Sequence, residues 1–157
     1  MEYADFLSID AKLVHNQVVK AGYEIRENSP YCLMMEKTLA LHDGRAKIIY
    51  LCTQNLKNIL LWDAPVGPRT ALSSSREKKA SFFMSKALTH EAVHAAQYCN
   101  SGNLIAPDKS STAVTEFKNR AIELSLAIGG TREREEEAYT LETNPIFVVN
   151  ALKKYCL

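Results

Sequence analysis

The residues of this chain best suited to chemistry are two histidines and a glutamate in the segment 89–97, Thr-His-Glu-Ala-Val-His-Ala-Ala-Gln. Four residues make just over one helical turn, so His90 and His94 should lie on one helix face. Two imidazoles at that spacing can bind one zinc ion, each through a single ring nitrogen. Glu91 lies about 100° further round the helix, where it can accept a proton from water at the metal. The segment therefore predicts a zinc site with a general base beside it.

The same spacing also arises by chance, in roughly 1% of shuffled chains of this composition. The alternative interpretation is a surface helix that carries two histidines and no metal. The flanking residues favour the metal site, because they are apolar and either small or branched and therefore predict a buried helix. Two histidines in a buried helix need polar partners. These flanking residues are Ala87, Leu88, Ala92, Val93, Ala95 and Ala96.

A catalytic zinc usually takes three protein ligands, and an acidic run downstream supplies candidates for the third. Three of its members are expected on a solvated helix face with arginine partners: Glu133, Glu136 and Glu137. Glu135 differs, because on the helical wheel it lies between Ala138 and Tyr139 and so points inward, where a carboxylate needs a partner. Glu135 is therefore the predicted third ligand. The alternatives are Glu142, Glu136 and the loop residue Asp108.

The order of these residues resembles a known class of metallopeptidase. His90-Glu91-Ala92-Val93-His94 followed by Glu135-x-x-Ala138 resembles the gluzincin pattern, in which a downstream helix supplies a glutamate ligand. Residues 52–55, Cys-Thr-Gln-Asn, ahead of the motif are similar to the mitochondrial inner-membrane metallopeptidases that process an ATP synthase subunit. Small ImmA/IrrE-like and SprT-like metallopeptidases are comparable in size and motif order. The resemblance implies a minimal zincin-like fold, a Zn2+ cofactor and hydrolysis of peptide bonds in a protein or peptide substrate.

The resemblance also implies roles for individual residues. Glu91 would be the general base and then the proton donor to the leaving amine. Tyr139 would stabilise the oxyanion or simply pack in its helix, and Trp62 would line the cleft or lie in the core. The substrate could add a strand to the sheet along an edge formed by Arg45–Leu51. Two rival classes remain: an inactive zincin-fold binding or regulatory module with a structural metal, and a sensor that acts through Cys99.

The rest of the sequence predicts an α+β fold in which a small antiparallel sheet packs on the motif helix and further helices follow. The sheet is expected over residues 23–52, with a hairpin turn at Asp43-Gly44 and His42 facing solvent at that turn. A Ser74/Glu77 capping box is expected to start the motif helix, which ends near residue 100. The expected helix at 111–128 has a buried apolar stripe. That stripe consists of Val114, Phe117, Ala121, Leu124 and Ile128. The other helices are expected at 5–21, 55–62, 131–143 and 146–156, with a loop at 63–68.

Composition sets the remaining expectations. The 157 residues fit a single domain spanning 1–157, and the formal net charge of +1 gives no indication of nucleic-acid binding. No apolar run is long enough to cross a membrane, and the N-terminus lacks an apolar signal segment, which predicts a cytoplasmic protein, or a mitochondrial or other location if a presequence is missing. The four cysteines form no Cys-x-x-Cys pair, so free buried thiols are expected, although the even count leaves disulfides open. The oligomeric state is not predicted.

Overall fold

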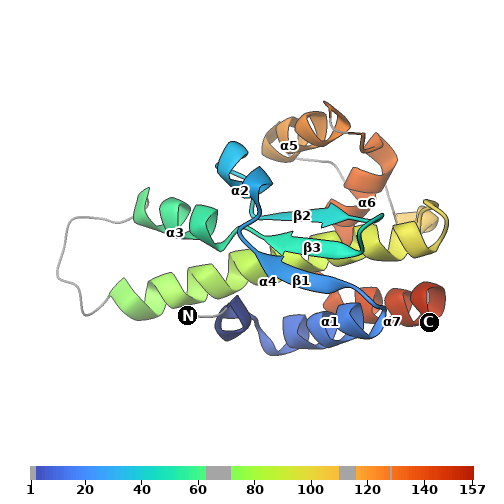
Figure 1. Ribbon diagram of the computed structural model, residues 1–157, viewed down its shortest axis with the longest axis horizontal. Helices are drawn as coiled ribbons and strands as arrows, with labels where there is room; N and C mark the ends of the chain where they lie inside the picture. Colours follow the sequence, from blue (N-terminus) through green and yellow to red (C-terminus); the bar gives the residue numbers. More distant parts are fainter. Residues whose placement is uncertain (1–2, 63–71, 110–115, 128) are drawn as a thin grey trace.

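The computed structural model describes residues 3–62, 72–109, 116–127 and 129–157, and it confirms the expected α+β class (Figure 1). The helices in this part of the chain are η1 (Tyr3–Phe6), α1 (Ile9–Lys20), α2 (Pro30–Met34), α3 (Thr53–Trp62), α4 (Leu72–Cys99), η2 (Pro107–Lys109), α5 (Glu116–Ala127), α6 (Arg132–Leu141) and α7 (Pro145–Cys156). The strands are β1 (Glu24–Glu27), β2 (Ala40–Asp43) and β3 (Ile48–Leu51).

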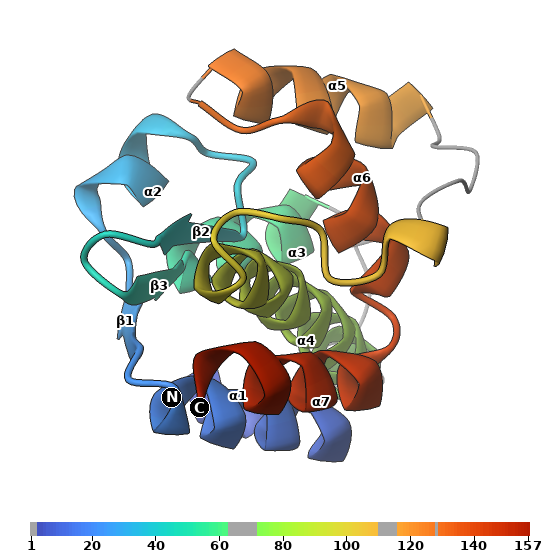
Figure 2. The ribbon, with the colours of Figure 1, turned by 90° about the vertical axis from the view of Figure 1, so that its right-hand side faces the viewer.

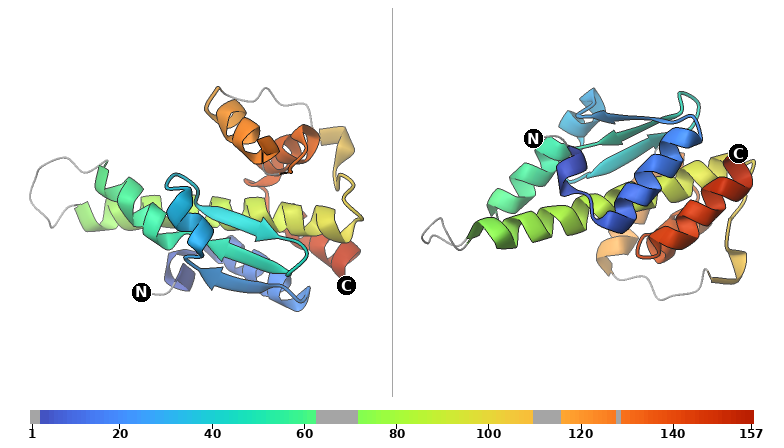
Figure 3. Two further views of the ribbon diagram at one scale, coloured as in Figure 1. Left: turned by 45° about the horizontal axis from the view of Figure 1, so that its top comes forward. Right: turned by 90° about the horizontal axis from the view of Figure 1, so that it is seen from below.

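The long helix α4 is the centre of the fold. The sheet lies on one side of it, α1 and α7 lie side by side on another, and α6 crosses the half of α4 that carries the histidine motif (Figures 1 and 2). In the right-hand view of Figure 3, which is taken from below, α1 and α7 lie together in front of α4. The apolar residues that flank the histidines are nearly all inaccessible, as their types predicted. Those with no exposed surface are Leu88, Ala92, Val93, Ala95 and Ala96.

The sheet differs from the prediction in its strand directions. The strand order is β1-β3-β2, with β1 parallel and β2 antiparallel to β3, so the sheet is mixed. The reason is α2, which occupies residues that were expected to belong to the sheet. This helix takes the chain from β1 at one edge of the sheet to β2 at the other, and β3 then pairs between them. Pro30 stands at the start of α2, where its fixed φ suits a first helical turn.

The same topology corrects the predicted substrate edge. The segment Arg45–Leu51 contains β3, which is the central strand and pairs with a neighbour on each side. Its backbone groups are already used in the two ladders, so it cannot add a further strand. The edge strands of the described sheet are β1 and β2, and β2 is the one that lies toward α6 (Figure 1).

The predicted hairpin at Asp43-Gly44 is confirmed, although residues 44–47 form its turn. The Asp43 carboxylate accepts a hydrogen bond from the backbone N–H of Ala46 at 2.9 Å. The ring of Tyr98 lies against Gly44 and leaves no room for a Cβ atom there. The prediction for His42 is wrong: it lies within β2 and not at the turn, and its ring stacks on His94 with 6.3 Å between centroids.

Helix boundaries follow local capping chemistry in some places and not in others. The Ser8 hydroxyl accepts from the Ala11 N–H, and the Asn144 side chain accepts from the Phe147 N–H, so α1 and α7 each begin at a capping side chain. In contrast, α4 begins at Leu72, so Ser74 lies inside the helix and the predicted capping box is wrong. The expected loop at 63–68 and the start of the helix expected at 111 lie outside the described residues.

The predicted buried stripe of the helix at 111–128 is wrong at Leu124, while the side chains of Val114, Phe117 and Ile128 lie outside the described set. Ile122 has no exposed surface, whereas Leu124 is 64% exposed. In the structure α5 packs mainly on α6, and this contact selects a different face of the helix.

The expectation of free thiols is wrong. Cys32 is bonded to Cys52 and Cys99 to Cys156, and no cysteine of the chain is free. Spacing gave no signal for this pairing, because the partners are 20 and 57 residues apart and the fold alone brings them together. None of the described helices combines the length and the hydropathy that a bilayer crossing requires.

Candidate metal centre

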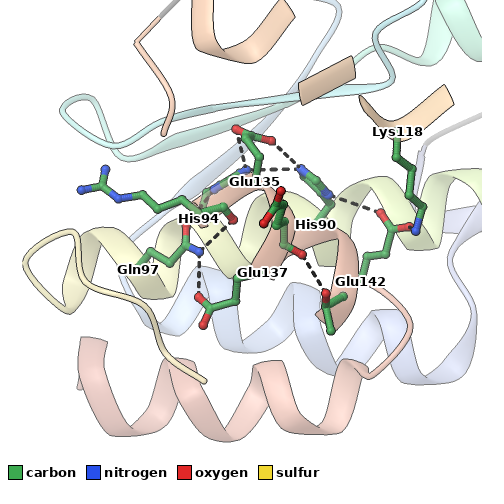
Figure 4. A network of polar contacts seen from close by, with 10 residues as sticks. His90, His94, Gln97, Lys118, Glu135, Glu137 and Glu142 are labelled. Atoms are coloured by element: carbon green, nitrogen blue, oxygen red, sulfur yellow. Dashed lines mark hydrogen bonds and ion pairs between the residues drawn. The ribbon is translucent and has the colours of Figure 1, made fainter. Parts of the chain in front are cut away.

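Two helices bring the predicted ligands together. On α4, His90 and His94 are one turn apart and their Nε2 atoms are 3.2 Å from each other. The first turns of α6 place the Glu135 carboxylate over both rings, with Oε2 at 3.5 Å from Nε2 of His90 and Oε1 at 3.4 Å from Nε2 of His94 (Figure 4). In the described part of the chain, this is the only cluster of histidine, cysteine and carboxylate side chains close enough to share a metal ion.

The spacing of these donor atoms fits a small divalent cation. Ligands about 2.0–2.1 Å from a tetrahedral zinc lie about 3.3 Å from one another, which is close to the separations found here. Glu135 Oε2 is buried and has no hydrogen-bond partner, which is costly for a carboxylate oxygen unless a cation satisfies it. Gly130 leaves space for this carboxylate, since a Cβ atom there would lie 3.1 Å from Glu135 Oε1.

The other nitrogen of each ring decides which atom is available to a metal. Nδ1 of His90 lies 3.3 Å from Oε2 of Glu142, and Nδ1 of His94 lies 2.9 Å from Oε1 of Gln97. Both partners are oxygen acceptors, so in the neutral form of each ring Nδ1 carries the proton and Nε2 offers a lone pair toward the cluster. Metal-binding histidines in proteins are commonly oriented in this way.

The sequence did not predict the buried hydrogen-bond relay from His94 to Gln97 and on to Glu137. Gln97 donates from Nε2 to Glu137 at 2.8 Å and to the Arg134 carbonyl at 3.1 Å, which fixes its oxygen toward His94. Glu137 in turn accepts from the backbone N–H groups of Ile105 and Ala106. The prediction of a solvated face for Glu137 is wrong, because it is only 1% exposed. The signal that could have found it is Gln97, a polar residue one turn beyond His94 in a buried helix.

We expect Gln97→Leu to weaken zinc binding by about 10–100-fold, because His94 would lose the acceptor that fixes its tautomer and orientation. Competition with a chromogenic chelator measures this loss. The matched control is Gln17→Leu on α1, another buried glutamine, which should leave metal affinity unchanged. Equal metal affinity in Gln97→Leu and the parent protein would exclude a role for the relay in metal binding.

The side chain of Glu142 lies behind His90 instead of beside the ligands. Its Oε2 faces Nδ1 of His90, and its Oε1 lies 2.9 Å from Nζ of Lys86 and 3.5 Å from Nζ of Lys118. It therefore orients His90 and does not take the place of Glu135.

Glu136 and Asp108 do not belong to the cluster of donors. The Glu136 carboxylate accepts from Arg132 Nε at 2.8 Å, one turn away on the same helix. Asp108 is exposed in η2. Of the four carboxylates considered for the third ligand, Glu135 is thus the one that the fold places against both histidines.

The charges at this cluster are strongly coupled. Burial alone would lower the pKa of His90, but the nearby carboxylates of Glu135 and Glu142 outweigh burial and raise the pKa to about 10. Burial would raise the pKa of Glu135, yet the two histidines outweigh it and lower that pKa. Without a metal, a proton on His90 thus supplies the positive charge that the carboxylates require, and a metal would compete for the same electron pairs.

Glu91 interacts electrostatically with His90, His94 and the nearby glutamates, but it is not one of the three donors that could share a metal ion. Burial raises its pKa, against the opposing effect of His90 and His94. A raised pKa suits a group that must accept and then release a proton near neutral pH. Glu91 is 9% exposed, so the protein shields it from most solvent.

The rings of Tyr139 and His42 border His90 and His94, one on each side. The Tyr139 ring meets His90 edge-on at 4.5 Å between centroids, and burial together with the nearby carboxylates raises the pKa of its hydroxyl, which keeps it a hydrogen-bond donor. On the other side, His42 contacts His94, and its Nε2 lies 3.4 Å from the Tyr23 hydroxyl. Burial and the neighbouring His94 lower the pKa of His42 to about 3, so its ring is neutral. The side chain of Trp62 lies outside the described set.

Comparison with known proteins gives a family but no activity. Residues 3–157 match the family model described as a domain of unknown function, DUF8637. The chain belongs to this family. No curated protein and no solved structure matches it. For this DUF8637 protein, functional inference therefore depends on the geometry of the cluster itself.

Proposed function

We propose that this protein is a zinc-dependent peptide-bond hydrolase. The observation that supports this most strongly is the convergence of the Nε2 atoms of His90 and His94 with the Glu135 carboxylate, with Glu91 adjacent on α4. The described residues offer three donors and not four. Structural zinc sites are usually closed by four protein ligands, whereas catalytic sites keep one position open. Three donors therefore favour catalysis.

The residues divide into those that hold zinc and those that move protons. His90, His94 and Glu135 would hold the ion, and when bound it would supply Lewis acidity toward water and a peptide carbonyl. Glu91 would take a proton from the attacking water and return it to the leaving amine nitrogen. Tyr139 would donate a hydrogen bond from its hydroxyl toward the oxygen on which negative charge develops.

The proposed binding site for the substrate is the outer edge of β2. In the described sheet β2 pairs with β3 on one side only, which leaves its outer edge available for an extended peptide. His42 of β2 stacks on His94, so a peptide hydrogen-bonded along this edge would pass close to the cluster. This assignment replaces Arg45–Leu51 and retains the mode of binding, in which a substrate extends the sheet.

Elemental analysis of the purified protein tests the metal assignment, and anomalous scattering at the zinc edge in crystals tests its location. We expect one zinc ion per chain between the three donors. A peptide library digested with and without a zinc chelator tests the activity, which should disappear with chelation and return when zinc is restored. A protein that binds no zinc would contradict the metal site. A protein that binds zinc but cleaves no peptide would contradict the hydrolase activity.

For Glu135→Gln we expect zinc affinity to fall by more than the roughly 10–100-fold typical of residues behind a ligand, because an anionic donor becomes a neutral amide. Equilibrium dialysis against zinc measures the change. Glu133→Gln, an exposed glutamate two residues earlier on α6, is the matched control and should bind zinc as the parent does. Full zinc affinity in Glu135→Gln would place the third ligand elsewhere.

Burial supports one rival function. His90 is 9% exposed and Glu135 is 6% exposed, which would also suit a structural metal in an inactive binding or regulatory module. The peptide digest separates this rival from the enzyme. For the other rival, a site that senses a ligand or redox state through Cys99, the bond to Cys156 leaves no free thiol at that residue.

A further inference from the structure

We propose that this protein folds and works in an oxidising compartment, outside the reducing cytosol, with two structural disulfides formed. The inference is independent of the proposed function, because it depends on the cysteines and not on the metal cluster. It replaces the cytoplasmic location expected from the sequence.

All four cysteines of the chain are used in pairs. The Cα atoms are 5.4 Å apart in Cys32–Cys52 and 5.1 Å apart in Cys99–Cys156, within the usual range for disulfides. No thiol is left over for catalysis or for a metal, and the only cluster in the described residues that could hold a metal contains no cysteine. Disulfides are rare in reducing compartments, so complete pairing indicates an oxidising one.

The Cys32–Cys52 bond fixes the segment that leads into β2. It joins α2 to the residue that follows β3, and both cysteines are almost fully buried, at 1% and 0% exposed. The Asn55 side chain holds the same segment, because its Nδ2 lies within hydrogen-bond distance of the carbonyl oxygens of Cys32, Met35 and Thr38. Such an inaccessible bond is a structural one, because redox-active cysteines need access to a partner thiol.

The Cys99–Cys156 bond connects the C-terminal ends of α4 and α7. The partners are 57 residues apart, so the bond closes most of the chain that follows α4 into one loop. Closing a loop of this length removes much conformational freedom from the unfolded chain. Cys99 also lies two residues after Gln97, so the bond secures the end of the helix that carries the histidines.

The redox state in the protein's own cells is the decisive test. Cells are quenched in acid, the denatured protein is alkylated with a maleimide without reductant, and the labelled thiols are counted by mass spectrometry. We expect no labelled thiol before reduction and four after it, with peptides containing Cys32–Cys52 and Cys99–Cys156 in a non-reducing digest. Four labelled thiols before reduction, or different pairs, would overturn the inference. This readout does not involve zinc or activity, so its failure leaves the proposed hydrolase untouched.

Thermal unfolding of the purified full-length chain tests whether the bonds are structural. We expect the double variants Cys32→Ala/Cys52→Ala and Cys99→Ala/Cys156→Ala each to lower Tm by about 5–15 °C. Reductant should lower the Tm of the parent and leave a variant without any of the four cysteines unchanged. Double variants as stable as the parent, with no effect of reductant, would show that the bonds contribute nothing and would contradict the proposal.

Discussion

Replacing Glu91 with glutamine is expected to lower kcat/KM for peptide cleavage by about 10³-fold or more, while zinc content stays at the level of the parent. Glutamine keeps the size of the side chain but cannot accept a proton at its amide. Glu91 is not among the three clustered donors, so the metal should remain. Initial rates on a fluorogenic peptide, measured beside elemental analysis, separate the loss of chemistry from the loss of metal.

The control for this variant is Glu123→Gln on α5, where the glutamate is exposed. Removing the same charge there should leave both cleavage and zinc content unchanged. If Glu91→Gln retained most of the activity, the proton acceptor would have to be another group and the hydrolase mechanism proposed here would fail. If it lost zinc as well, Glu91 would belong to the ligand set.

The local pattern of the sequence was sufficient to predict the centre of the site. The helical spacing of His90 and His94 depends only on backbone geometry, and the inward phase of Glu135 follows from the apolar residues beside it. The structure brings these three side chains together. The buried partners Gln97 and Glu137 could not be assigned in this way, because their hydrogen bonds cross from α4 to α6 and to the backbone at 105–106.

Long-range pairing accounts for most of the remaining errors. Whether β3 is central or at an edge depends on β1, whose residues pair with residues 24 positions further along the chain, as in Glu24 with Ile48. Hydrophobic alternation shows that a segment is a strand but carries no information on its neighbours. The prediction of free thiols was wrong for the same reason, because the spacing of cysteines along the sequence does not show which of them lie close together in the fold. The burial of His42 could not be predicted either, because which face of β2 meets α4 depends on packing.

For His94→Ala we expect zinc content of the purified protein to fall to the background level, because two of the three clustered donors cannot hold the ion against water. Removing the imidazole also leaves Gln97 Oε1 without its hydrogen-bond partner. The free energy of unfolding of the metal-free variant should therefore fall by about 1–3 kcal/mol. Zinc at about 100 times its Kd should stabilise the parent by about 2.7 kcal/mol and the variant not at all. Thermal unfolding with and without added zinc measures the difference.

The matched control is His15→Ala on α1, where the histidine pairs with Tyr3 and is remote from the cluster in sequence. It should bind zinc and respond to it as the parent does, which separates the loss of any histidine from the loss of this ligand. Zinc-dependent stabilisation that survived in His94→Ala would refute the ligand assignment. Because this readout requires no substrate, it distinguishes a failed metal site from a metal site that is intact but does not catalyse peptide hydrolysis.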